Sequence, residues 1–241
     1  MRRHQASGGP PPPQGGAHPR GIFGRRRGRR LRPQQKSLLE SLLPGLALDL
    51  SAPPPADLET LFAAPVEAIE FEIGFGGGEH LRSRARQHPA RGFIGCEPFV
   101  NGMAKLLTAI DGDALGNIRL HHGDARDVLA WLPDSCLAEI FLLYPDPWPK
   151  RRHRKRRLIT DTTLAAMARV LRRGAHLRFA SDSADYVQWT LSRGLRCRLL
   201  EWTATRADDW HQPWPDFSGT RYEEKARQEG RVPVYLVFRR V

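Results

Sequence analysis

Four carboxylates in this chain stand at or just after short apolar runs of the kind that form β-strands. They are Glu72, Glu97, Asp124 and Asp146. Ligands of open α/β sheets bind beyond the carboxyl ends of the parallel strands, so side chains at these positions would meet at one edge of such a sheet. Carboxylates attract cations and accept hydrogen bonds from hydroxyl and amino groups. The pattern therefore predicts a site for a cationic ligand that carries such groups.

A glycine-rich segment, E-I-G-F-G-G-G, begins at Glu72. Its residues Gly74, Gly76 and Gly78 would let the backbone approach a ligand closely where the next helix begins. The spacing does not match the dinucleotide fingerprint G-x-G-x-x-G, because Glu79 stands where the third glycine would be when counted from Gly74. The acidic flanks would also repel a pyrophosphate. The segment therefore disfavours NAD and favours a cationic ligand without phosphate.

Two of the carboxylates indicate what this ligand contains. Glu97 lies 25 residues after Glu72, where an acidic side chain accepts hydrogen bonds from ribose hydroxyls, although a solvated carboxylate at a helix start is the alternative. Asp124 could accept a hydrogen bond from an adenine amino group, and an ordinary N-cap is its alternative. Together they describe an adenosine-containing ligand. S-adenosylmethionine, which has a positive sulfonium and no phosphate, fits this description.

The most informative segment is Y-P-D-P-W-P-K, which begins at Tyr144 after a predicted strand. Its prolines restrict the backbone and hold Asp146 beside the flat ring of Trp148. The segment runs directly into a stretch in which seven of eight residues are Lys or Arg, namely Lys150, Arg151, Arg152, Arg154, Lys155, Arg156 and Arg157. A nuclear-import-like run or a solvated helix face is the alternative. Its place beside the ligand site favours phosphate binding, and therefore a nucleic-acid substrate.

The charge of the chain is unevenly distributed. Its 38 basic and 26 acidic residues give a net charge of +12, but residues 1–36 hold ten basic residues and no acidic one. Without these residues and the basic stretch, the remainder carries −5. Residues 1–36 consist mainly of Gly, Pro and Arg, so we expect a disordered basic arm. A transit peptide is the disfavoured alternative, because Pro10 to Pro13 break any amphipathic helix.

The elements that would position these residues alternate along the chain. Strands are predicted at 69–73, 92–96, 118–121, 138–143, 174–180, 195–200 and 232–239, and helices at 79–87, 98–109, 125–131, 158–171 and 184–192. This order predicts an α/β fold over residues 37–241, with a mostly parallel seven-stranded sheet, helices on both faces and an antiparallel edge strand. The segment 202–223 shows no helix or strand period. We expect it to be a functional loop that closes over the site, with a packed surface loop as the alternative.

Several protein classes are disfavoured. No stretch approaches the roughly 20 apolar residues of a membrane span, and the N-terminus lacks the apolar region of a secretory signal. The three cysteines Cys96, Cys136 and Cys197 show no ligand spacing, so we expect reduced thiols and no metal site. These features predict a cytoplasmic protein that does not bind membranes.

The motifs together resemble those of the bacterial-type tRNA (guanine-N7)-methyltransferases. The resemblance runs from about Ile22, where F-G-R-R-R-G-R is similar to the basic N-terminal segment of that family, to the C-terminus. It includes the glycine-rich segment, G-C-E ending at Glu97, G-D-A around Asp124, P-D-P-W-P-K, A-S-D ending at Asp182 and T-R-Y-E beginning at Thr220. The proline motif with its basic extension is highly specific. Residues 1–21 have no clear counterpart.

The resemblance implies a Rossmann-like S-adenosylmethionine-dependent methyltransferase fold and methylation of N7 of guanine 46 in tRNA. It implies that the four carboxylates contact S-adenosylmethionine and that Asp146 is catalytic. No obligate protein partner is evident in the sequence, and we expect a monomer or homodimer. The implied substrate contacts are Lys150, Asp182, Thr220, Arg221, Tyr222 and Glu223.

The chemistry would be modest, because guanine N7 carries a lone pair and no proton. Transfer then needs positioning and electrostatic support more than a strong base. We expect Asp146 and Asp182 to support the purine as it becomes cationic, and Trp148 to stack on the target base or to pack under it. Two alternatives are a methyltransferase acting on an exocyclic amine and a non-catalytic RNA-binding protein on the same scaffold.

Overall fold

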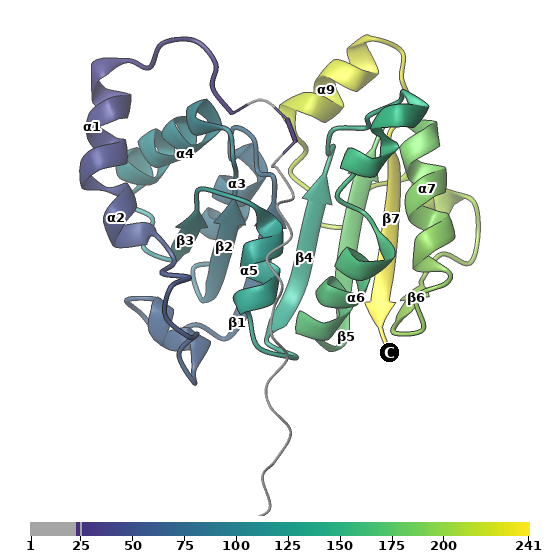
Figure 1. Ribbon diagram of the computed structural model, residues 1–241, viewed down its shortest axis with the longest axis horizontal. Helices are drawn as coiled ribbons and strands as arrows, with labels where there is room; N and C mark the ends of the chain where they lie inside the picture. The colour runs from purple at the N-terminus through teal and green to yellow at the C-terminus, as the bar shows by residue number, and fades with distance from the viewer. Residues whose placement is uncertain (1–22, 25) are drawn as a thin grey trace, which may run out of the picture.

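The computed structural model describes residues 23, 24 and 26–241, and its core is one seven-stranded sheet (Figure 1). The strand order is β3-β2-β1-β4-β5-β7-β6, in which β1 to β5 are parallel and β7 runs antiparallel to both of its neighbours. The strands are β1 (Ala68–Ile73), β2 (Arg91–Cys96), β3 (Ile118–His121), β4 (Leu137–Leu143), β5 (Leu171–Ser181), β6 (Leu200–Trp202) and β7 (Val234–Arg240). The predicted fold class is confirmed.

Helices cover both faces of the sheet. They are α1 (Pro33–Ser41), α2 (Leu43–Leu46), α3 (Glu79–Gln87), α4 (Val100–Asp113), α5 (Ala125–Trp131), α6 (Asp161–Val170), α7 (Ala184–Gly194), α8 (Asp208–His211) and α9 (Arg221–Gln228), with 3₁₀ helices η1 (Leu58–Leu61) and η2 (Arg151–Arg156). Side chains of β1 alternate between the faces. Ile69, Phe71 and Ile73 pack in the core formed with α5, α6 and α7, whereas α1, α3 and α4 pack in a second core.

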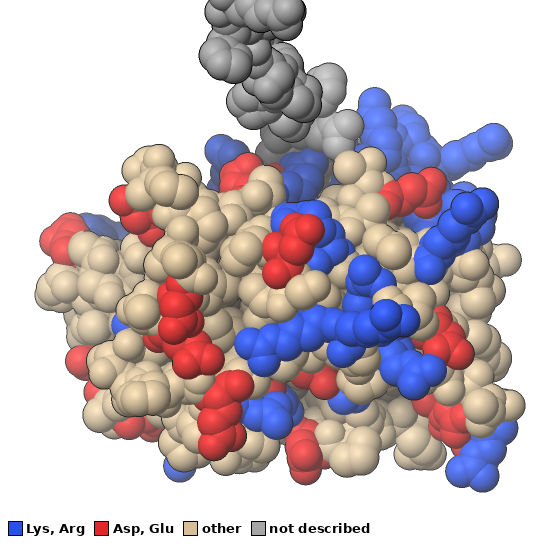
Figure 2. Space-filling model, turned by 90° about the horizontal axis from the view of Figure 1, so that it is seen from below, with Lys and Arg blue, Asp and Glu red and all other residues tan. Residues whose placement is uncertain are grey.

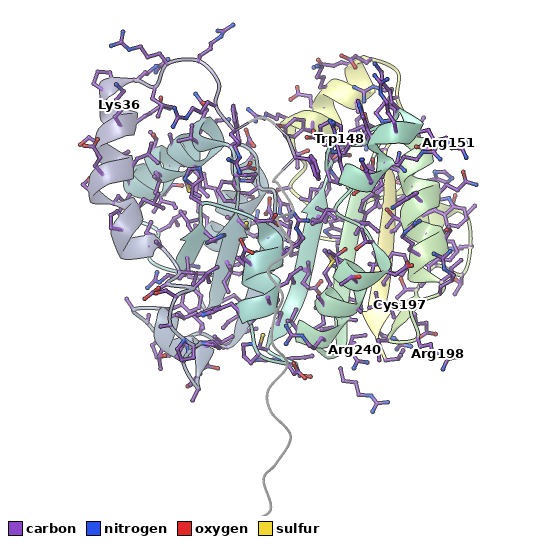
Figure 3. All side chains as sticks on the ribbon, viewed as in Figure 1. Lys36, Trp148, Arg151, Cys197, Arg198 and Arg240 are labelled. Carbon is purple, nitrogen blue, oxygen red and sulfur yellow. The ribbon has the colours of Figure 1, made fainter. Side chains whose placement is uncertain are left out.

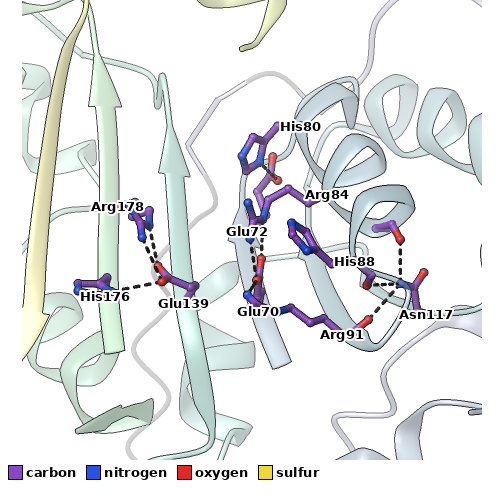
Figure 4. Close-up of polar contacts among 11 residues, drawn as sticks. Glu70, Glu72, His80, Arg84, His88, Arg91, Asn117, Glu139, His176 and Arg178 are labelled. Atoms are coloured by element: carbon purple, nitrogen blue, oxygen red, sulfur yellow. Dashed lines mark hydrogen bonds and ion pairs between the residues drawn. The ribbon is translucent and has the colours of Figure 1, made fainter. Parts of the chain in front are cut away.

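The other face of β1 and β4 carries charged side chains that are buried or half-buried (Figure 4). Glu70, which is 1% exposed, accepts hydrogen bonds from Arg84 at 2.7 and 2.8 Å and from Arg91 at 2.6 Å. On the neighbouring strand, Glu139 accepts from Arg178 at 2.7 Å and lies 3.2 Å from His176. Buried carboxylates need such paired partners to offset lost hydration. These contacts tie α3 to β1 and β4 to β5, which fixes the strands whose ends form the site.

Several boundaries differ from the prediction. The strand predicted at 195–200 is wrong, because the chain turns after α7 and β6 begins only at Leu200. The helix predicted at 158–171 begins at Asp161, where Thr160 caps it by accepting from the Thr163 N–H. The helix predicted at 98–109 runs from Val100 to Asp113. The segment 202–223 is not irregular throughout, since it contains α8 and leads into α9.

Most of the predicted N-terminal arm lies outside the described residues. Within the predicted range 1–36, residues 33–36 form the first turn of α1. Residues 26–31 approach α4, where the Val100 N–H donates to the Arg26 carbonyl at 3.0 Å. Across the described part of the chain, no helix is both long and apolar enough to cross a membrane.

Candidate functional site

The four predicted carboxylates converge on one edge of the sheet, which we call the carboxyl edge because β1 to β5 all end there. Glu72 is the penultimate residue of β1, Glu97 directly follows β2, Asp124 precedes α5 after β3, and Asp146 follows β4. Neighbouring strands β1, β2, β3 and β4 are parallel and in register up to this edge. The topology therefore brings together residues that are separated by up to 74 positions in the sequence.

Glu97 clamps the glycine loop, which we define as residues 74–78. Its carboxylate accepts the Gly76 N–H at 2.6 Å and the Phe99 N–H at 2.9 Å, and the residue is 7% exposed. Burial raises the pKa of Glu97 to about 6, although the two backbone donors oppose this. Because both donors are backbone N–H groups, Glu97 is the only side chain in this clamp, and it fixes the glycine loop between β1 and α3.

The glycine loop requires glycine for conformational and steric reasons. Gly74, Gly76 and Gly78 all have positive φ, with values of 71°, 58° and 77°. A Cβ on Gly78 would approach the Leu106 side chain to 2.6 Å. On the open side of the loop, a Cβ on Gly76 would lie 3.1 Å from the ring of Tyr222. The loop therefore packs tightly on α4 and lies beneath the start of α9.

Glu72 has a partner that the sequence did not predict. His80, on the first turn of α3, places its Nδ1 2.7 Å from Glu72 Oε2, and both residues are buried (Figure 4). The His80 ring also packs near Phe141 and Phe217, with centroid distances of 4.8 and 5.5 Å. The pair fixes the orientation of Glu72 at the edge.

Asp124 occupies the N-cap of α5. It accepts the Arg126 N–H at 2.9 Å and pairs with the Arg126 guanidinium. Burial by itself would raise the pKa of Asp124, but hydrogen bonds from Arg126 lower it below its ordinary value. Both residues also line a cavity of about 680 Å³ between α5 and α6. The capping interpretation of Asp124 therefore holds, and the side chain still lies at the carboxyl edge.

Asp146 lies in the proline loop, which we define as residues 144–150. Tyr144 and Trp148 both have positive φ, 49° and 43°, which is unusual for large side chains and is typical of strained functional loops. Asp146 is exposed at the surface, yet neighbouring groups withdraw its carboxylate from water enough to raise its pKa. Gly24 lies against it, since a Cβ there would be 3.2 Å from Asp146 Oδ2. The N-terminal segment thus reaches the predicted catalytic residue.

Trp148 is held by a cation of the basic strip, which we define as residues 150–157. The Arg156 guanidinium lies 4.9 Å from the Trp148 ring centroid and 5.4 Å from that of Phe23. His153 approaches the same indole edge-on at 5.9 Å. Figure 3 shows Trp148 and Arg151 near the upper edge of the molecule. Arg156 therefore joins the N-terminal segment to the proline loop.

The basic strip is only partly available to a ligand. Lys150, Arg151, Arg152 and Lys155 are exposed, while Arg154 is half-buried and donates to Asp185 at 2.6 Å.

The expectation that Arg157 contacts RNA is corrected, because this residue is only 2% exposed. Its Nε donates to the Pro147 carbonyl at 2.8 Å, it pairs with Asp185, and its guanidinium lies over the rings of Tyr186 and Trp189. Arg157 anchors the proline loop to α7 beneath the strip.

The T-R-Y-E segment forms the start of α9 and faces the glycine loop. Thr220 caps the helix by accepting the Glu223 N–H at 3.1 Å. Arg221 lies 3.8 Å from Glu79 and donates to the Tyr222 hydroxyl at 3.0 Å. Thr220, Arg221 and Glu223 line a cavity of about 440 Å³ together with Glu79, Ser218, Gly219, Glu224 and Arg227. The structure therefore places the predicted substrate segment beside the predicted cofactor loop.

Two predicted substrate contacts have partners within the chain. Asp182, after β5, pairs with Arg231, which follows α9. Glu223 accepts from the Tyr235 hydroxyl at 2.6 Å and from Arg227 at 2.9 Å. None of these three partners stands in a recognisable motif, so no signal in the sequence pointed to them. Both contacts hold α9 against the sheet.

A further group of arginines lies at the opposite end of the sheet. Viewed from below, Lys and Arg side chains gather on the half of the molecule that carries β5, β7 and β6 (Figure 2). Arg172 and Arg173 are exposed at the start of β5, and Arg198 precedes β6. Figure 3 labels Arg198 and Arg240 at this end, far from Trp148. These residues supply a matched comparison for the basic strip.

Comparison with known proteins agrees with this arrangement. A family model described as "Putative methyltransferase" matches residues 67–236. A tRNA (guanine-N(7)-)-methyltransferase of Nitrobacter hamburgensis is 58% identical over 219 residues, which cover 91% of this chain and 86% of the relative. A protein of the same name from Brucella melitensis is 54% identical over 217 residues, covering 90% of this chain and 93% of the relative.

Solved structures share the fold at lower identity. The 16S rRNA methyltransferase KamB aligns with a TM-score of 0.56 and 18% identity, covering 79% of this chain and 95% of KamB. A precorrin-6y C5,15-methyltransferase from Geobacter metallireducens aligns with a TM-score of 0.50 and 11% identity, covering 76% and 88%. The sheet and its helices therefore have the fold of known methyltransferases.

Proposed function

We propose, from the premise that this chain belongs to the family of the tRNA (guanine-N7)-methyltransferases, that it transfers the methyl group of S-adenosylmethionine to N7 of guanine 46 in the variable loop of tRNA. One observation carries the proposal. The Glu97-clamped glycine loop, the strained proline loop with Asp146 and the exposed part of the basic strip all lie at the same edge of the sheet.

The residues at the ends of β1 to β3 suit S-adenosylmethionine. Glu72 and Glu97 are buried carboxylates on either side of the glycine loop, and Asp124 lies at the end of the next strand. Buried negative charge favours a cationic ligand, and the glycine loop lets the backbone approach it. Glu72, Glu97 and Asp124 would hold the cofactor, which supplies an electrophilic methyl group on a sulfonium when bound.

The proline loop would act on the target base. Guanine N7 already has the attacking lone pair, so the protein must align the base and support the positive charge that methylation creates on the purine. Asp146 is the carboxylate that we assign to this charge. Its position is set by the flanking prolines and by Arg157, which binds the Pro147 carbonyl. No proton has to leave N7, so a general base is not required.

The exposed cations would bind the tRNA backbone. Lys150, Arg151, Arg152 and Lys155 lie next to the proline loop, and phosphate contacts of this kind position an RNA without reading its sequence. The protein would then work in the cytoplasm, where tRNA is available, as a monomer or homodimer.

The direct test is to incubate the protein with labelled S-adenosylmethionine and unmodified tRNA and then map the methylated nucleoside. We expect 7-methylguanosine at position 46. Label on an adenine or on an exocyclic amine would favour the alternative methyltransferase class. Tight tRNA binding without any methyl transfer would favour a non-catalytic RNA-binding protein.

A further inference from the structure

Glu223 is a buried carboxylate with one engaged and one unengaged oxygen. Oε1 accepts the Tyr235 hydroxyl at 2.6 Å and two Arg227 nitrogens at 2.9 and 3.2 Å. Oε2 is buried and has no hydrogen-bond partner among the residues that the structure describes. A buried acceptor without a donor is costly, so such an atom is commonly completed by a ligand or water. Glu223 also lines the cavity beside the glycine loop.

Tyr235 is the rigid member of this group. It lies on β7 opposite Ala180 of β5 and is 1% exposed. Its ring packs edge-on against Trp214 and Phe217, at centroid distances of 5.9 and 5.8 Å. Burial raises the pKa of Tyr235 to about 12, with a further contribution from Glu223, so the hydroxyl remains a donor at neutral pH. Arg227, by contrast, is the more exposed partner, with 56% of its side chain accessible to solvent.

The same cluster reaches the proline loop through Tyr144. This residue packs with Tyr235, Trp214 and Ala180, and its backbone N–H donates to the Ala180 carbonyl at 2.7 Å. Burial raises the pKa of Tyr144 above its ordinary value, and the nearby Tyr235 and Glu223 add to this effect. Tyr144 holds the positive φ that begins the turn into Pro145 and Asp146. One buried tyrosine therefore contacts both the substrate segment and the start of the proline loop.

We propose that Tyr235 is a positioning residue for methyl transfer: its hydroxyl fixes Oε1 of Glu223 so that Oε2 is presented to the substrate, and its ring supports Tyr144 at the start of the proline loop. This inference rests on the proposed function. It adds a residue outside every motif of the sequence, and it explains why a buried carboxylate can keep one oxygen unengaged. The hydrogen bond to Tyr235 holds the carboxylate in place without neutralising it.

The test compares Tyr235→Phe with Tyr186→Phe. Tyr186 is equally buried, and its hydroxyl accepts the Ile159 N–H at 3.3 Å on the other face of the sheet. Both variants lose one buried hydroxyl, so both should stay folded with a lower Tm, and Tyr235→Phe should show the somewhat larger decrease because its hydroxyl binds a charged group. Only Tyr235→Phe should lower kcat/KM for tRNA, by about tenfold, because a hydrogen bond to a charged group is lost. The Kd for S-adenosylmethionine should change less than twofold in both.

A double-mutant cycle identifies Glu223 as the residue through which Tyr235 acts. Once Glu223→Gln has removed the charge, adding Tyr235→Phe should cause little further loss of kcat/KM. Multiplicative effects of the two substitutions would overturn the proposal, as would equal kcat/KM in Tyr235→Phe and Tyr186→Phe. Wild-type protein is assayed in the same series. If the wild type forms a product other than 7-methylguanosine, the proposed function fails, and this result is kept separate from the test of Tyr235.

Hydrogen exchange gives a readout that does not depend on activity. Tyr235→Phe should speed amide exchange at residues 221–224 relative to Tyr186→Phe, whereas exchange at residues 144–148 should stay near the wild-type rate because the ring that supports Tyr144 is kept. Wild-type exchange rates at residues 221–224 would overturn the positioning role even if the enzyme acted on another substrate.

Discussion

The two halves of the carboxyl edge hold their acidic side chains in different ways. At the ends of β1 and β2, Glu97 binds backbone N–H groups at two points and Glu72 binds the short, buried side chain of His80. At the end of β5, Asp182 pairs with Arg231, which follows α9, and at the end of β4 the loop that carries Asp146 is held by Arg157 through the Pro147 carbonyl. The first half is therefore fixed by groups of the sheet edge itself, whereas the second depends on segments that pack against it, α9 among them.

This difference separates the expected roles of the halves. A preorganised acidic pocket suits a small cofactor, because little is lost in ordering it. A helix held by a few side chains suits a large RNA, which has to enter and leave. Substitutions in the β1 to β3 half should therefore change stability and cofactor affinity, and those in the β4, β5 and α9 half should change turnover and tRNA binding.

Asp146→Asn should give the largest effect on turnover. The effect should be limited to the second half of the edge, so that cofactor binding changes little. Loss of the charge that supports the methylated purine should lower kcat by about 10² to 10³, as is typical when a preorganised electrostatic group is removed. The Kd for S-adenosylmethionine, measured by calorimetry, should rise much less. Near-normal single-turnover methylation would remove Asp146 from the mechanism.

Gly78→Ala should distort the glycine loop in the first half of the edge. The residue has φ of 77°, and a Cβ would lie 2.6 Å from Leu106. We expect a loss of about 2 to 4 kcal/mol in the free energy of unfolding, from backbone strain and overpacking, together with weaker cofactor binding. Gly112→Ala is the matched control, because Gly112 lies within α4 with nothing near its Cβ position. Equal denaturation midpoints for the two variants would contradict the account of the glycine loop.

The positions of the elements could be predicted because parallel strands buried on both faces appear as short apolar runs between helix-length segments. The strand predicted at 195–200 failed for a related reason. Leu195 and Leu199 are apolar but exposed, so this apolar run does not correspond to a buried strand. The helix α9 was missed because its composition is almost wholly polar, and it is held by Glu223 and Ala226 alone on its buried side.

The positions of the acidic side chains were also predictable, but their partners were not. His80 meets Glu72 because the glycine loop turns α3 back onto β1, which no spacing rule encodes. Arg157 looks like the rest of the basic strip, yet Asp185, 28 residues later, draws it into the protein. Such pairings depend on tertiary packing, whereas a single sequence reports mainly local preference.

Arg151→Ala with Arg152→Ala should weaken tRNA binding about tenfold at low salt. The slope of log K against log salt should fall in magnitude by up to about 2, one for each lost phosphate contact. Arg172→Ala with Arg173→Ala is the control, since this pair is also exposed and adjacent but lies at the amino end of β5. Equal losses from both pairs would show that tRNA binds the overall charge of the protein and not the strip.

The pKa of Glu97 predicts a pH dependence that has opposite directions for protein stability and for cofactor affinity. Its pKa is about 6 in the folded protein against an ordinary value of 4.5, so the folded state binds the proton more readily. The corresponding contribution to the free energy of unfolding, about 2 kcal/mol, is fully present below pH 4.5 and is lost as pH rises through about 6. Cofactor affinity should change the other way, because protonation removes the negative charge. The Kd for S-adenosylmethionine should rise about twofold from pH 7.5 to 6 and about tenfold at pH 5, and a Kd independent of pH over this range would exclude the Glu97 carboxylate from cofactor binding.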